Sequence, residues 1–150
     1  MLRDPSLIPL SRQHHDGLAL CVLIRRGLQQ DAGSGTSAEL ARKAVDRYDL
    51  ELVNHFQLEE QILFPAMQAV LGDLPLVAQL IAEHRRLESL FVKLRSEPSA
   101  TLLETMCGLL ERHIRAEENE LFQMAQSSLP EATLREMGAV LESKAVRVCF

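Results

Sequence analysis

The chain has 150 residues, of which 47% are hydrophobic and only 4% aromatic, and this length suits one globular domain with a full core. We expect residues 1–150 to form that single domain. Sixteen basic residues against 21 acidic ones give a net charge of −5, and no basic stripe is present, so we expect no nucleic-acid partner.

Membrane insertion and secretion are not expected either. The longest apolar run, residues 17–24, is far shorter than the ~20 residues of a membrane-spanning helix. The N-terminus lacks the apolar stretch of a signal peptide. Three cysteines without a CxxC pair fit a reducing cytoplasm. Cys21 and Cys107 are expected in the core, and Cys149 as a free thiol without an assignable role.

Breakers divide the chain into five predicted helices, at about residues 10–30, 36–64, 75–95, 100–127 and 130–144. Thr36 and Glu39 are spaced as a capping box for the second helix. Pro65 is expected to end or kink that helix, because proline lacks the N–H and clashes with the preceding turn. Pro75 suits the first turn of the third helix.

The first four predicted helices carry apolar residues at three- and four-residue spacing, as Leu87, Leu90 and Leu94 illustrate. Short connections make sequential helices antiparallel neighbours. We therefore predict an all-α fold, an antiparallel up-down four-helix bundle over about residues 10–127, with a short extra helix at about 130–144. One core layer is expected to contain Val22, Tyr48, Phe91 and Met106.

The two halves of the chain repeat one motif. The sequence HFQLEEQILF at 55–64 is echoed by HIRAEENELF at 113–122. A further histidine precedes each copy, His84 before the second and His15 before the first. His15 is preferred to the adjacent His14 because His15-x-x-Leu18 matches His84-x-x-Leu87. His14 is expected in solvent.

The four-residue spacing within each copy indicates metal chemistry. Residues i and i+4 lie on one face of a helix, so His55 with Glu59, and His113 with Glu117, can each offer a nitrogen and a bridging carboxylate. Counting from the loops places all four histidines at one height. Glu60 and Glu118 point about 100° away and are expected in solvent, with support of a ligand histidine as the alternative.

Two bridging carboxylates indicate two metal ions, and imidazole with carboxylate but no thiolate suits Fe, Mn or Zn. The predicted ligands are those shared by the two copies and the upstream histidines: His15, His55, Glu59, His84, His113 and Glu117. Open positions on six-coordinate iron would admit dioxygen or another small ligand.

The motif HxxxEExxLFP at 55–65 resembles that of the hemerythrin-like, or HHE cation-binding, family, and the resemblance covers about residues 10–125. It implies a four-helix bundle around two iron ions, oxo- or hydroxo-bridged, with Mn or Zn as possible substitutes. It also implies the same six ligands in this sequence. The family's iron–sulfur-repair branch adds a cysteine-bearing N-terminal segment, and that role is not expected here.

One departure from the family concerns reversible oxygen carriage. Oxygen carriers have HxxxH on the third helix, whereas the partner positions of His84 are Leu80 and Glu88. Glu88 is either a substitute ligand or an exposed partner of Arg85 or Arg95. The function expected is therefore a metal centre that binds or responds to dioxygen or a similar ligand, in sensing, scavenging or iron handling.

Two alternatives of other classes stay open. One is a di-metal oxidase or peroxidase-type enzyme, for which Tyr48 is the visible proton donor. The other is a metal-free helical interaction module.

Overall fold

The computed structural model describes residues 2–148, so Cys149 lies outside the described residues. In this part every regular element is helical, which confirms the all-α class. The helices are α1 (Ile8–Gln30), α2 (Ser34–Arg47), α3 (Val53–Leu58), α4 (Phe64–Leu71), α5 (Pro75–Ser96), α6 (Ala100–Ala116), α7 (Phe122–Ser128) and α8 (Glu131–Lys144). A short 3₁₀ turn, Pro5–Leu7, precedes α1.

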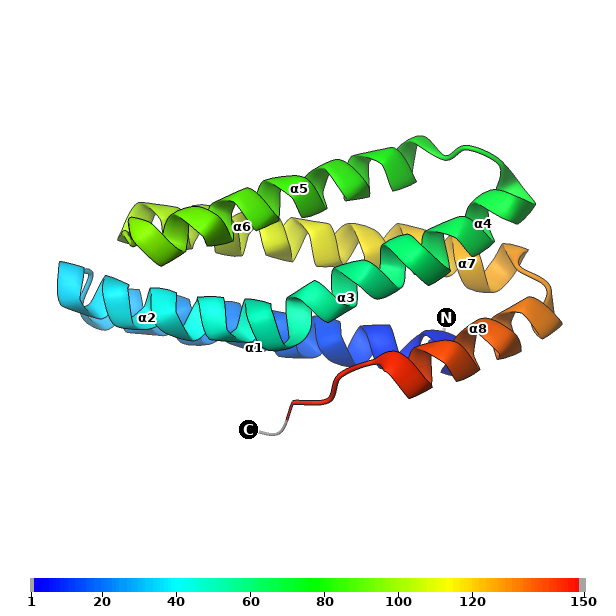
Figure 1. Ribbon diagram of the computed structural model, residues 1–150, viewed down its shortest axis with the longest axis horizontal. Helices are drawn as coiled ribbons and strands as arrows, with labels where there is room; N and C mark the ends of the chain where they lie inside the picture. Colours follow the sequence, from blue (N-terminus) through cyan, green and yellow to red (C-terminus); the bar gives the residue numbers. More distant parts are fainter. Residues whose placement is uncertain (1, 149–150) are drawn as a thin grey trace.

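The eight helices form five continuous arms, because π-helical turns join several of them end to end. Tyr48–Leu52 and Glu59–Leu63 join α2, α3 and α4, and Glu117–Leu121 joins α6 to α7. The arms are thus residues 8–30, 34–71, 75–96, 100–128 and 131–144, and the chain reverses direction at each loop between them (Figure 1).

Pro65 does not end the second arm, which continues to Leu71. The proline lies in the first turn of α4, directly after a π-helical turn, where a missing N–H is tolerated. Gly72 ends the arm instead, with a φ of 75° that favours glycine.

The predicted capping box at Thr36 is wrong, because the second arm begins two residues earlier, at Ser34, with Gly33 as its N-cap. The Thr36 hydroxyl donates instead to Asp31 Oδ2 at 2.7 Å, and Asp31 Oδ1 accepts from the Gly33 N–H at 2.9 Å. Asp31 therefore organises the loop.

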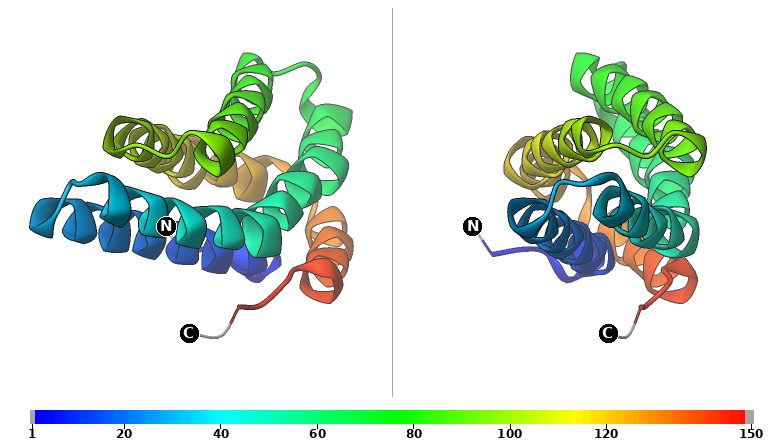
Figure 2. Two further views of the ribbon diagram at one scale, coloured as in Figure 1. Left: turned by 60° about the vertical axis from the view of Figure 1, so that its left-hand side comes forward. Right: turned by 90° about the vertical axis from the view of Figure 1, so that its left-hand side faces the viewer.

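Four arms surround a common interior. α1 packs on α2 and α6, and α5 packs on α2 and α6, as the end-on view of Figure 2 shows. The fifth helix, α8, contacts α1, the 3₁₀ turn and the π-helical turn before α4. It buries Leu134, Met137 and Leu141, so α8 also contributes to the core.

The interior consists of two apolar clusters. One contains residues 20–28 of α1 and 40–45 of α2 together with residues 87–94 and 103–114. Cys21 and Cys107 belong to this cluster and are buried free thiols. The other contains residues 58–80 and 121–141 with Leu7 and Leu10. A polar layer of buried histidines and glutamates lies between the two clusters on the first four arms, and it consists of His14, His55, Glu59, His84, His113 and Glu117.

The predicted core layer is correct except at Val22. Phe91 and Met106 are fully buried, and Tyr48 stacks on Phe91 with ring centroids 4.3 Å apart. Val22 is 49% exposed. None of the helices in the described range is long and apolar enough to cross a membrane.

Candidate metal centre

Five of the six predicted ligands meet at the centre of the molecule. His55, Glu59, His84, His113 and Glu117 are all at most 2% exposed, although they come from three different arms. The prediction that the four-residue spacing would turn each His–Glu pair inward is therefore borne out by the arrangement of these side chains.

The sixth position is His14 and not His15, so the predicted helix phase of α1 is wrong by one residue. His14 is 3% exposed and lies beside Glu117, whereas His15 is exposed and lines a surface pocket with Arg12 and Asp16.

The physical reason is the phase of the apolar face of α1. Leu10, Cys21 and Ile24 are all buried, and His14 lies on their face. Gly17 lies three residues after His14, and a Cβ there would meet Ile114 Cδ1 at 3.3 Å. Gly17 thus occupies, relative to His14, the position that Leu87 occupies relative to His84. The predicted match paired Leu18 with Leu87 and therefore selected His15.

The ligand-capable atoms form two overlapping groups, in each of which all atoms lie within 4.8 Å of one another. One group is His14, His55, Glu59 and Glu117, and the other is Glu59, His84, His113 and Glu117. The two glutamates belong to both groups. Each group therefore offers two imidazoles and two shared carboxylates, which is a donor set for two neighbouring ions.

The Nε2 atoms of the histidines face the shared carboxylates. His113 Nε2 lies 3.0 Å from Glu117 Oε1, and His84 Nε2 lies 3.0 Å from Glu59 Oε1. On the other side, His14 Nε2 lies 3.1 Å from Glu117 Oε1, and His55 Nε2 lies 3.3 Å from Glu59 Oε1.

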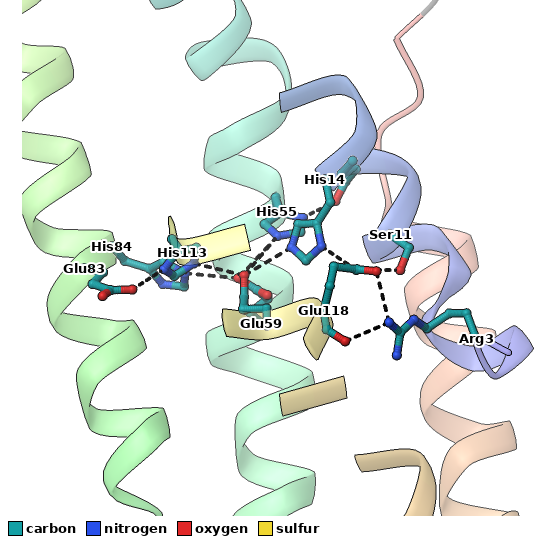
Figure 3. Close-up of polar contacts among 11 residues, drawn as sticks. Arg3, Ser11, His14, His55, Glu59, Glu83, His84, His113 and Glu118 are labelled. Carbon is teal, nitrogen blue, oxygen red and sulfur yellow. Dashed lines mark hydrogen bonds and ion pairs between the residues drawn. The ribbon is translucent and has the colours of Figure 1, made fainter. Parts of the chain in front are cut away.

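Each Nδ1 atom has its own acceptor on a neighbouring arm, and Figure 3 shows the one for His14, which is Glu118. His14 donates to Glu118 at 2.7 Å, and His84 donates to Glu60 at 2.7 Å. The alternative that these two glutamates support histidines is confirmed. Since Nδ1 carries the proton, Nε2 is left free to bind a metal, and such acceptors also make the imidazole a stronger ligand.

The other two acceptors lie outside the repeated motif and were not predicted from it. Gln13 Oε1 lies 2.9 Å from His55 Nδ1, and Glu83 Oε1 lies 2.8 Å from His113 Nδ1. Gln13 directly precedes His14, and Glu83 directly precedes His84. Aligning His14 with His84 would have revealed this shared polar neighbour.

The π-helical turns bring an aromatic ring onto the same face as each shared glutamate. Residues five apart are roughly 140° apart around an α-helix, so Glu59 and Phe64 would diverge in one. Here the wider turn begins at Glu59, and Phe64 reaches the His84 ring, at 6.0 Å between centroids. The second copy is equivalent: its turn begins at Glu117, and Phe122 stacks on His14 at 5.2 Å.

The two shared carboxyl groups differ in the direction of their pKa shifts. Burial, together with the nearby Glu117, raises the pKa of Glu59 well above its usual value. Burial also opposes ionisation of Glu117, but His113 and the hydrogen bonds from its neighbours outweigh it and hold the pKa of Glu117 well below the usual range. Two carboxyls this close do not both ionise readily without added positive charge.

The histidines respond to burial and to these carboxylates. Burial lowers the pKa of His55 to about 4 and that of His84 to about 2. Burial alone would lower the pKa of His113 too, but Glu117 and Glu83 raise it to about 9. Neutral imidazole is the form that binds metals, and two of the four are held in it.

The donor atoms left without partners fit a pair of cations. Within residues 2–148, His55 Nε2, Glu59 Oε2 and Glu117 Oε2 are buried and make no hydrogen bond. A buried polar atom in that condition costs free energy unless it is paired or bound to a metal. All three belong to the two overlapping groups, so the orphaned atoms point to the positions that ions would take.

Glu88 belongs to neither group. It pairs with Arg85 on the surface of α5, and Leu80, at the other partner position of His84, is fully buried among apolar side chains. The third arm therefore contributes one histidine to the centre.

Comparison with known proteins gives one match. The family model of the hemerythrin HHE cation-binding domain matches residues 9–125. No curated protein and no solved structure matches the chain.

Proposed function

Because the chain belongs to the hemerythrin HHE cation-binding domain family, we propose that it holds two iron ions in the buried centre and binds or responds to dioxygen or a similar small ligand. The ligands are the two shared glutamates and four histidines: His14, His55, Glu59, His84, His113 and Glu117. Imidazole and carboxylate without thiolate suit iron, manganese or zinc, and the family resemblance is the reason for proposing iron.

The observation that carries this proposal is the pair of overlapping donor groups with shared carboxylates. Two buried glutamates beside each other would be a large cost in a metal-free protein, because a bare buried charge loses its hydration. Two divalent ions would supply the charge that both carboxylates need and would use the three orphaned atoms.

The iron pair would supply redox chemistry and open positions for a small ligand. The protein's own residues do the rest. Glu118, Glu60, Gln13 and Glu83 hold the Nδ1 protons and fix the four ring orientations. Phe56 stacks on His84 with ring centroids 4.1 Å apart and covers that side of the centre from water.

The fold supports the same function. We propose that the first four arms correspond to the antiparallel four-helix bundle of the family, and that α8 is an addition that packs on α1 and on the π-helical turn before α4. Sensing, scavenging and iron handling all fit a buried centre of this kind. We also propose that the protein is cytoplasmic.

Metal analysis of the purified protein tests this function. After expression with ample iron we expect two iron ions per chain, with near-ultraviolet absorption in air. Glu59→Ala removes a ligand of both ions and is expected to lose at least one. Glu120→Ala removes an exposed carboxylate of the second copy and should keep both. Fewer than about 0.2 metal ions per chain in the wild type, against the two-ion site expected for this ligand set, would favour the metal-free interaction module.

A second candidate, a di-metal oxidase or peroxidase-type enzyme, is favoured by one observation. A surface groove of about 430 Å³ is lined by Tyr48, Phe56, Glu60 and Arg85, and Phe56 also stacks on the ring of His84. Tyr48 is the proton donor expected for such an enzyme. Sustained turnover of peroxide with a reductant, lost in Tyr48→Phe while both ions remain, would favour this candidate over ligand binding.

A further inference from the structure

We propose that the two metal positions are inequivalent, and that the position between His84 and His113 takes the first and more tightly held ion. The position between His14 and His55 is then the exchangeable one. This inference rests on the proposed function, since it concerns the ions that the centre would hold. It adds a ranking of the two positions and names the residue that sets it, Glu83.

When His14, and not His15, is matched with His84, the two halves show where the two metal positions differ. His14 matches His84, and each donates its Nδ1 proton to a glutamate of the other half, Glu118 or Glu60. The acceptors for the other two histidines do not match. Glu83 accepts from His113 at 2.8 Å, whereas the equivalent residue, Gln13, accepts from His55 at 2.9 Å. One position thus has two carboxylate acceptors and the other has one.

The Gln13 amide is held in this role by its other contacts. Its Nε2 donates to Asn54 Oδ1 at 2.9 Å and to the Val146 carbonyl at 3.1 Å. Asn54 in turn donates to the Lys144 carbonyl at 3.0 Å and accepts from the Val146 N–H at 2.9 Å. With both N–H groups used, Oε1 is the atom that faces His55, so this histidine has a neutral acceptor fixed in place by the C-terminal segment.

The neighbouring cations increase the difference. Glu118 is paired with Arg3 at 3.1 Å, and Glu60 is paired with Arg85, so each of these two carboxylates is offset by a guanidinium. Glu83 has the neutral Gln79 as its further partner, with Nε2 at 3.3 Å. Counted over residues 2–148, the position at His84 and His113 therefore has one more negative charge without a cationic partner close to it than the other position.

A carboxylate acceptor strengthens a histidine ligand more than an amide does, because it lets negative charge develop on the ring. Changing such a partner typically alters metal affinity by about 10- to 100-fold. We expect a difference of that size between the two positions of this centre.

Titration with Co²⁺ alone, followed by calorimetry and by the visible bands of the ion, tests the ranking. His55→Ala removes a ligand of the weaker position and should bind its first ion within about threefold of wild type, whereas His113→Ala should bind its first ion about 10- to 100-fold more weakly. Circular dichroism of each metal-free variant establishes that it is folded. Equal first-ion affinities, or a larger loss in His55→Ala, would overturn the ranking.

Glu83→Gln tests the residue responsible, since it keeps the shape and removes the charge. In the His55→Ala background we expect it to weaken the first ion about 10- to 100-fold, and in the His113→Ala background by less than about threefold, because its partner is gone. Glu104→Gln, an exposed carboxylate of α6, is the matched control and should change neither. An equal effect of Glu83→Gln in both backgrounds would show that Glu83 acts only through general charge.

The same titration separates the two proposals. Wild-type protein that binds Co²⁺ no more tightly than a Glu59→Ala/Glu117→Ala double variant would contradict the proposed function itself. Two bound ions without a preferred position would leave the function standing and refute the ranking alone.

Discussion

Replacing His14 and His15 separately tests the helix phase that defines the centre. In the metal-free protein, His14→Ala removes the ring that bonds Glu117 at 3.1 Å and Glu118 at 2.7 Å, and it leaves a space against Phe122. Hydrogen bonds to charged groups contribute about 1.5–3 kcal/mol each, and both carboxylates keep other partners, so we expect a loss of about 3 kcal/mol.

His15→Ala should change the free energy of unfolding by less than about 0.5 kcal/mol, because the ring is exposed. For a chain of this size 1 kcal/mol shifts the melting temperature by about 2–4 °C, so the two variants should differ by about 6–12 °C. Thermal unfolding of chelator-treated protein, followed by circular dichroism, measures this difference in melting temperature. The iron content of the untreated proteins, measured in parallel, should fall only in His14→Ala. Equal shifts, or a larger one in His15→Ala, would refute the inward placement of His14.

Three further outcomes are expected. Removing metal with a chelator should lower the free energy of unfolding by about 2.7 kcal/mol where free metal had been 100 times Kd, and an unchanged melting temperature after complete metal loss would contradict a stabilising site. The free energy of unfolding of the metal-free protein should fall by roughly 2–3 kcal/mol between pH 6.5 and 9. The folded pKa of His113 is raised to about 9, so its contribution to stability, complete below pH 6.5, is lost as the pH rises through that value, and the raised pKa of Glu59 acts in the same direction. Urea titrations at several pH values measure this dependence. Gly138→Ala should cost about 1–3 kcal/mol in urea unfolding, since a Cβ there would lie 2.7 Å from Ser6 Cα, whereas Gly35→Ala, with open space around it, should not destabilise.

Much of the fold is predictable from the sequence because it depends on local signals. Four of the five predicted helices match the observed arms within a few residues, since glycines, prolines and apolar periodicity mark their ends. The second arm shows the limit of such signals. Pro65 looks like a terminator, but the π-helical turn before it places the proline where its missing N–H is harmless. The second copy has Gln123 at that place and forms the same kind of turn, so the turn does not depend on proline.

The candidate site was predictable where spacing alone decides it, as for His55 with Glu59. It was not predictable where the two neighbours His14 and His15 compete, because Leu18 offered a false match to Leu87. The true match, Gly17, has no side chain and lets α1 approach Ile114 closely. Close helix packing of this kind is a tertiary effect, and it leaves no apolar side chain at position 17 to match Leu87, although Leu10, Cys21 and Ile24 mark the same face.

The crossed support between the two halves has a consequence for assembly. Glu118 of the second half orients His14 of the first, and Glu60 of the first half orients His84 of the second. Each group of donor atoms likewise draws on both halves, because Glu59 and Glu117 belong to both. Neither helix pair contains the complete proposed ligand set by itself. The free energy of the proposed metal binding would therefore be available only after the halves pack in register, and it would stabilise that packed state over any in which they have separated.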